Sequence, residues 1–172
     1  MIIDHTIGNY ENPLHPFIMV CYSANHENQA LVELAGDLVT RVDAELNGVF
    51  RKDVDFWRFI DISSDDILPE NLQDRRERAV LGLCLLSTMF LASAACRQEL
   101  DYFTAQKRAV LVRLAPMPLL HPRANIPALR GKVVLPWNGS SYADCKIEAE
   151  KTRFASIIVS DIMVHLDEVL GN

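Results

Sequence analysis

Short apolar runs alternate with longer amphipathic stretches along most of the chain. The run FIMVCYS at 17–23 is apolar at successive positions, as a central strand is when helices cover both faces of a parallel sheet. Later runs rich in aliphatic, β-branched and aromatic residues predict strands at 57–62, 80–87, 109–115 and 132–137. Strands separated by helical stretches indicate a parallel α/β sheet, since parallel neighbours need long crossover connections.

The stretches between these runs have helical spacing. Between Leu31 and Leu46, apolar residues recur at the i, i+3, i+4, i+7 spacing of an amphipathic helix. Asn25 or Asn28 is the expected cap of this helix, and Gly48 is expected to end it in a left-handed turn. Further helices are predicted from Pro69, over 93–106 and over 142–170.

Right-handed crossovers leave few topologies for five such strands. The predicted fold class is α/β, a flavodoxin-like three-layer sandwich with a five-stranded parallel sheet of order 2-1-3-4-5 and helices on both faces. A chain of 172 residues fits one domain. We expect a leader at 1–15 and the folded domain, including a C-terminal helix, at 16–172. In this strand order the ligand crevice lies outside the carboxyl ends of the first and third strands, at CYSAN (21–25) and LLSTM (85–89).

Composition and charge narrow the classes of function. A formal net charge of -6, without long basic blocks, makes nucleic acid an unexpected partner. The four cysteines form no CxxC pair and favour a reducing cytoplasm. Histidines are scattered and the HExxH, GxSxG and glycine-rich phosphate motifs are absent, so no metal and no bound cofactor is expected. The uncharged run 79–96 approaches the length of a membrane span, but its glycine and hydroxyl residues favour a buried strand followed by a polar turn.

The carboxylate of Glu99 follows the uncharged run 79–96. On a helix of 100° per residue, Cys96, Leu100 and Phe103 form one apolar stripe, and Glu99 lies on its flank, at the border of the core. Such a residue is either a solvated side chain of the helix surface or a partly desolvated carboxylate directed into the crevice. The spacing favours the first alternative and leaves both open.

A basic cluster, DRRERA at 74–79, also has two interpretations. Arg75, Arg76 and Arg78 are candidate phosphate ligands. They can equally form a solvated helix face that pairs with its own acidic residues, and this second interpretation is favoured.

Three stretches of the sequence together resemble one known family. They are FIMVCYS at 17–23, LCLLSTMFLASAACRQELDYF at 83–103 and AVLVRLAP at 109–116, and they resemble the Toll/interleukin-1 receptor (TIR) domain, especially bacterial TIR-like proteins. The family pattern is an apolar strand ending in Tyr-Ser, a strand ending in Ser, a short aromatic turn and Ser-x-x-Cys-x-x-Glu-Leu. It is matched at Tyr22, Ser23, Ser87, Phe90, Ser93, Cys96, Glu99 and Leu100.

The resemblance implies an enzyme of bacterial defence or signalling that takes NAD⁺ as its substrate. Glu99 matches the glutamate that active relatives need to cleave NAD⁺ between nicotinamide and ribose, giving ADP-ribose or a cyclic form. One carboxylate suffices, because it can stabilise the oxocarbenium-like ribose while nicotinamide is already a cationic leaving group. The expected substrate-binding residues are Tyr22, Ser23, Asn25, Asp61, Ser87, Phe90, Ser93 and Cys96. The short polar residues among them are also common turn and cap formers.

Two features depart from the family pattern. Ala95 stands where many active relatives have Trp, and the loop DISSDDILPENLQDRRERA at 61–79 lacks the usual glycine. In the family this loop contributes to ligand access and self-association, so its apolar tip, Ile67, Leu68 and Pro69, is expected to contact another copy in a homo-oligomer. An activating partner protein or ligand is a further expectation.

Two alternatives stay open beside the NAD⁺ nucleosidase. The first is a non-catalytic TIR interaction module that acts by assembling. The second is an enzyme like the nucleoside deoxyribosyltransferases, which share the fold and a glutamate-centred nucleoside chemistry.

Overall fold

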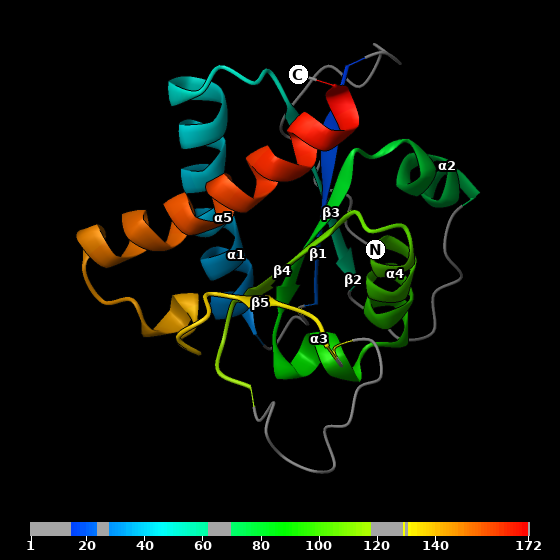
Figure 1. Ribbon diagram of the computed structural model, residues 1–172. Coiled ribbons are helices and arrows are strands. Elements are labelled where there is room, and N and C mark those ends of the chain that lie inside the picture. Colours follow the sequence, from blue (N-terminus) through cyan, green and yellow to red (C-terminus); the bar gives the residue numbers. More distant parts are fainter. Residues whose placement is uncertain (1–14, 24–27, 62–69, 118–128, 130, 172) are drawn as a thin grey trace.

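The computed structural model describes residues 15–23, 28–61, 70–117, 129 and 131–171, without the side chains of 59–61 and 70–73. Its centre is a five-stranded parallel sheet in the order β2-β1-β3-β4-β5, with helices packed on both faces (Figure 1). This confirms the predicted α/β fold and strand order. In the described part of the chain, no helix combines the length and apolar character needed to cross a membrane.

The strands lie close to the runs that predicted them. They are β1 (Phe17–Ser23), β2 (Asp55–Asp61), β3 (Leu81–Leu86), β4 (Ala109–Arg113) and β5 (Val134–Leu135). β3 is buried along its whole length and β1 along all but its first residue, because both occupy the centre of the sheet. β5 is shorter than the predicted 132–137, since Pro136 follows it directly and has no N–H to donate.

The helices are α1 (Gln29–Asp43), α2 (Glu70–Arg78), α3 (Thr88–Ala92), α4 (Ala94–Ala105) and α5 (Glu148–Leu170), with a π-helical segment η1 (Ala44–Val49) and a 3₁₀ turn η4 (Tyr142–Asp144). The predicted N-cap position of the first helix is confirmed at Asn28, whereas its predicted end at Gly48 is not found. Asn28 stands at the N-cap of α1 without a capping side-chain bond, and Asn25 lies outside the described residues. Gly48 lies inside η1 instead of ending the helix, and the left-handed residues are Arg51 and Asp53 beyond it.

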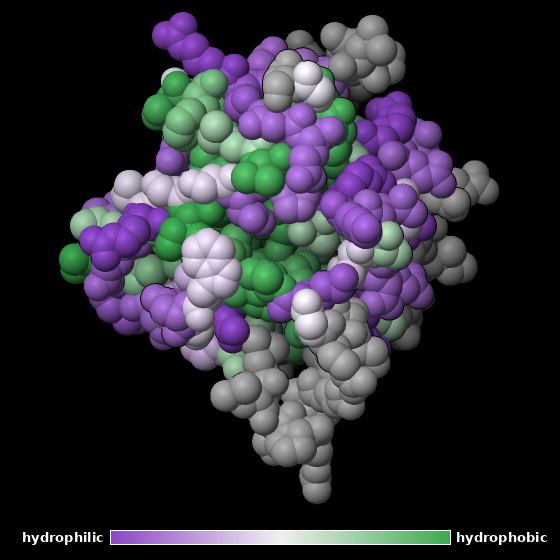
Figure 2. Space-filling view, viewed as in Figure 1, coloured by the Kyte–Doolittle hydropathy of each residue, from purple (hydrophilic) through white to green (hydrophobic). Residues whose placement is uncertain are grey.

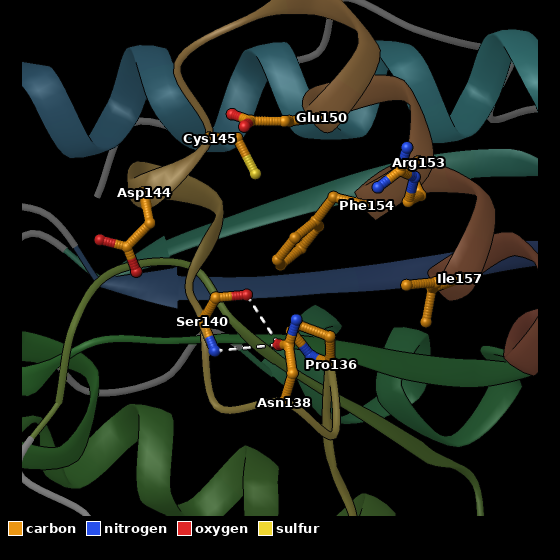
Figure 3. Close-up of a pocket in the computed structure, with 9 residues that line it drawn as sticks. All are labelled: Pro136, Asn138, Ser140, Asp144, Cys145, Glu150, Arg153, Phe154 and Ile157. Atoms are coloured by element: carbon orange, nitrogen blue, oxygen red, sulfur yellow. Dashed lines mark hydrogen bonds between the residues drawn. The ribbon is translucent and has the colours of Figure 1, made fainter.

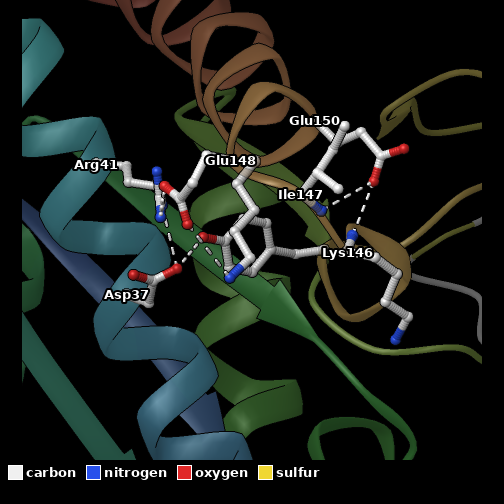
Figure 4. Close-up of polar contacts among 8 residues, drawn as sticks. Asp37, Arg41, Lys146, Ile147, Glu148 and Glu150 are labelled. Carbon is white, nitrogen blue, oxygen red and sulfur yellow. Dashed lines mark hydrogen bonds and ion pairs between the residues drawn. The ribbon is translucent and has the colours of Figure 1, made fainter.

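The C-terminal helix begins later than predicted. α5 starts at Glu148, and 142–144 forms η4 instead of the first turn of one helix over 142–170. Glu150 fixes this start, because its carboxylate accepts the backbone N–H of Lys146 at 2.8 Å (Figure 4). Gly171, at φ 69°, ends the helix in the left-handed conformation that glycine adopts without strain.

A polar network joins α1 to η4 and α5 (Figure 4). Tyr142 Oη donates to Asp37 Oδ2, and Arg41 Nε donates to the same oxygen at 3.1 Å. Arg41 Nη2 also donates to Glu148 Oε2 at 2.7 Å. Burial favours protonation of Asp37, but the hydrogen bonds from Tyr142 and Arg41 outweigh it and lower the pKa of Asp37. The network therefore holds the start of α5 against α1.

The core forms two layers, one on each face of the sheet (Figure 1). In the first, α1 and α5 pack on Ile18, Val20 and Tyr22 of β1. In the second, α4 packs on Met19 and Cys21 of the same strand. Successive side chains of a strand point to opposite faces, so β1 supplies both layers.

α4 lies close to the sheet at Gly82 of β3. A Cβ at this position would overlap the ring of Phe103 on α4. The missing side chain therefore lets the helix approach the strand. Phe103 is one turn from Glu99, so the same contact sets the depth at which Glu99 lies.

Candidate functional site

Glu99 lies inside the protein. The inward stripe of α4 consists of Cys96, Glu99, Leu100 and Phe103, and Glu99 is 0% exposed. The predicted position at the border of the core is therefore wrong. The periodicity of α4 does not show what covers this flank, whereas in the structure Arg76 of α2 packs against it.

Arg76 is the counter-ion of Glu99. Its Nη1 lies 3.2 Å from Glu99 Oε1, and its guanidinium lies over the ring of Tyr102, 4.5 Å from the centroid. Only one of the two carboxylate oxygens of Glu99 takes part in this ion pair. Glu99 Oε2 and Arg76 Nε are both buried without a hydrogen-bond partner among the described residues. A bidentate arginine–carboxylate pair would satisfy both oxygens.

The burial of Glu99 changes its acidity. Loss of hydration penalises the ionised carboxylate and raises the pKa of Glu99 from the ordinary 4.5 to about 7. The charge of Arg76 and its hydrogen bond lower the pKa and offset only part of this effect. Near neutral pH the carboxyl group is therefore populated in both protonation states.

Thiol side chains lie in the same layer as Glu99. Cys21 of β1 and Cys84 of β3 are neighbours in the sheet register, and Cys96 projects from α4. The pKa of Cys21 is raised well above its ordinary value, first by its hydrogen bond with Cys84, then by burial, with a smaller contribution from the charge of Glu99. Within the described ranges, no three side chains of the metal-ligating types form a group that could hold an ion. Glu99 thus shares its layer with sulfur and hydrocarbon.

Two of the predicted substrate-binding serines cap helices. Ser87 Oγ accepts the backbone N–H of Phe90 at 3.1 Å, and Ser93 Oγ accepts that of Cys96 at 3.2 Å. Each cap starts a new helix, which explains why α3 occupies the polar turn expected after β3. Phe90 and Cys96 are fully buried in the α4 layer.

The other predicted residues lie at the carboxyl ends of β1 and β2. Tyr22 packs in the layer of α1 and α5, on the face of the sheet opposite Glu99. Ser23 is buried and pairs in register with Asp61 of β2. Asn25 and the side chain of Asp61 lie outside the described residues, as does the predicted contact segment 67–69. The structure therefore groups Glu99 with Phe90 and Cys96 and separates it from Tyr22.

The basic cluster at 74–79 is only partly a self-paired surface. Arg78 Nη1 lies 3.7 Å from Asp74 Oδ2, one turn away, as predicted. Arg75 turns inward, with its guanidinium 4.7 Å from the centroid of the Trp57 ring, and Arg76 forms the ion pair described above. The prediction of a solvated face is wrong for these two residues. No spacing signal in α2 itself reveals the aromatic and acidic partners on other elements.

Cavities elsewhere on the surface involve other residues. One, of about 260 Å³, lies between the segment after β5 and α5, with Arg153 and Phe154 in its lining (Figure 3). Another, of about 400 Å³, is lined by Lys132, Trp137 and side chains of α4 and α5. Figure 2 shows the same face of the molecule as Figure 1. Apolar side chains line a hollow on this face, and polar side chains surround it. Among the predicted site residues that the structure describes, none lines either cavity.

No protein-family model matches the chain, and no curated protein matches it. The functional argument therefore depends on the geometry and chemistry around Glu99.

Proposed function

We propose that this chain is a TIR-type NAD⁺ nucleosidase, which removes nicotinamide from NAD⁺ and gives ADP-ribose or a cyclic form. The observation that carries the proposal is a single carboxyl group, Glu99, enclosed among thiols and hydrocarbon on the helical segment after the third strand of a 2-1-3-4-5 sheet. The resemblance of the motif from Ser93 to Leu100 to the TIR family supports the same residue. A role in bacterial defence or signalling rests on that resemblance.

The reaction needs only one ionised carboxylate. The bond between ribose C1′ and the nicotinamide nitrogen breaks, and its electron pair leaves with nicotinamide, which becomes neutral. C1′ then carries oxocarbenium character, which the Glu99 carboxylate stabilises. Water adds at C1′ and releases a proton to give ADP-ribose, whereas attack by an adenine ring nitrogen gives the cyclic product.

The surroundings of Glu99 suit this task. A carboxylate in a medium of low dielectric acts on a developing positive charge more strongly than it does in water. The pKa of Glu99 is about 7, so the ionised form is populated at neutral pH. No second catalytic acid is required, because the leaving group is already cationic.

A second candidate is a non-catalytic interaction module. Arg76 already neutralises the enclosed Glu99, as happens in purely structural ion pairs. Trp137 and Val133 are 75% and 61% exposed next to the edge strand β5, and they offer apolar surface to a partner or a second copy.

Nicotinamide release from NAD⁺ separates these functions. The purified chain is assayed at high concentration, where self-association is favoured, with deoxynucleosides in a parallel reaction. Glu99→Gln keeps the shape and removes the charge, and it is expected to lower release on the order of 10²-fold or more. Asp101→Asn, exposed on the same helix, is the matched control and is expected to equal wild type.

The other outcomes of the assay contradict the role of Glu99 or favour one of the alternative functions. Equal, non-zero release from wild type and Glu99→Gln eliminates Glu99 as the catalytic residue. Absence of release from every variant favours the interaction module. Free base from deoxynucleosides, without nicotinamide release, favours the deoxyribosyltransferase-like enzyme.

A further inference from the structure

No substrate atom can touch Glu99 in the arrangement described. Its side chain is 0% exposed, and Arg76 Nη1 stands 3.2 Å from its Oε1. A carboxylate that stabilises a ribosyl cation has to lie beside C1′. An element that encloses Glu99 therefore has to move before the proposed reaction can take place.

α2 is the candidate for this movement. Its described side chains, at positions 74–78, are all charged, so they bring little hydrocarbon to the core. The contacts that attach its second half to other elements include Arg75 over Trp57 and Arg76 over Tyr102. Elements that bury few apolar contacts open at the lowest free-energy cost.

The ion pair under α2 is incompletely satisfied. Glu99 Oε2 and Arg76 Nε are buried without hydrogen-bond partners among the described residues. Buried polar atoms of this kind carry a desolvation penalty that hydration returns when they become exposed. The closed arrangement therefore combines one favourable contact with a penalty that opening removes.

We propose that α2 is a cover over the catalytic carboxylate and that the Arg76–Glu99 ion pair is its latch. In the closed form Arg76 neutralises Glu99 and blocks it. When α2 lifts, Arg76 leaves Oε1 and the carboxylate becomes available to the ribose of NAD⁺. This inference rests on the proposed function. The contact of Arg75 with Trp57 fastens the same cover without touching Glu99.

Hydrogen exchange of the α2 backbone tests the cover independently of activity. Exchange over 74–79 is followed by mass spectrometry in the full chain, for wild type, Arg75→Ala and Arg76→Ala. Arg78→Ala is the matched control, because Arg78 pairs with Asp74 inside α2. Loss of one stacked or charge-assisted contact is expected to speed exchange of α2 by about tenfold or more in the first two variants, with β3 unchanged. Equal α2 exchange in all four proteins overturns the inference.

Nicotinamide release by Arg75→Ala is the second measurement. This variant keeps both members of the ion pair, so release is expected to rise about threefold or more as the open population grows. Faster hydrogen exchange of α2 together with reduced nicotinamide release overturns the latch. This result would mean that the reaction requires α2 in its closed position. Faster exchange with no release from any variant supports the cover and refutes the proposed nucleosidase.

Discussion

Replacing Glu99 by glutamine should change the pH dependence of stability. The pKa of Glu99 is about 7 in the folded protein, against an ordinary value of 4.5. Between these values the folded protein holds a proton that the unfolded chain has released. Stability therefore falls as the pH rises. The stabilising contribution is fully present below about pH 4.5 and is lost above about pH 7.

The size of the effect follows from these two pKa values. A tenfold change in a protonation equilibrium corresponds to about 1.4 kcal/mol, so the whole difference amounts to about 3 kcal/mol. Most of it, roughly 2.5 kcal/mol, falls between pH 5 and pH 8. Glutamine is neutral throughout, so the free energy of unfolding of Glu99→Gln should rise by this amount relative to wild type over that range.

Urea denaturation at pH 5, 6, 7 and 8 measures this difference. Asp101→Asn removes an exposed carboxylate from the same helix, and its stability should run parallel to that of wild type. If Glu99→Gln also runs parallel to wild type at every pH, the pKa of Glu99 is not raised. The argument from burial would then be wrong.

Two further substitutions test the packing around the site. Gly82→Ala should lower the free energy of unfolding by about 1–3 kcal/mol in thermal denaturation, because its Cβ would overlap the Phe103 ring. Gly48→Ala, with open space at its Cβ, is the control, and equal melting temperatures for the two would contradict the close approach of α4. Tyr142→Phe should cost about 1–2 kcal/mol by removing the hydrogen bond to Asp37, and NMR titration should find the pKa of Asp37 raised. No change in either quantity would show that this bond does not hold α5.

Much of the architecture follows from local pattern combined with general topology rules. The run FIMVCYS is apolar on both faces, which makes it a central strand, and the handedness rule leaves few strand orders, including the observed one. Element ends were predicted less well. The end of α1 depends on the π-helical segment η1, and the start of α5 depends on the bond from Lys146 N–H to the Glu150 side chain. In both cases alternative acceptors compete for backbone N–H groups.

The sequence pattern places Glu99 on the helical segment after the third strand, near an apolar stripe. Its enclosure is visible only in the folded chain, because the packing that buries Glu99 and raises its pKa brings together separate elements, among them Arg76, 23 positions away on another helix. The same holds for Tyr22, which lies across the sheet from Glu99. A helical or strand period reports which residues share a face of one element. Burial and charge pairing depend on which other element packs against that face, and this is settled only when the chain folds.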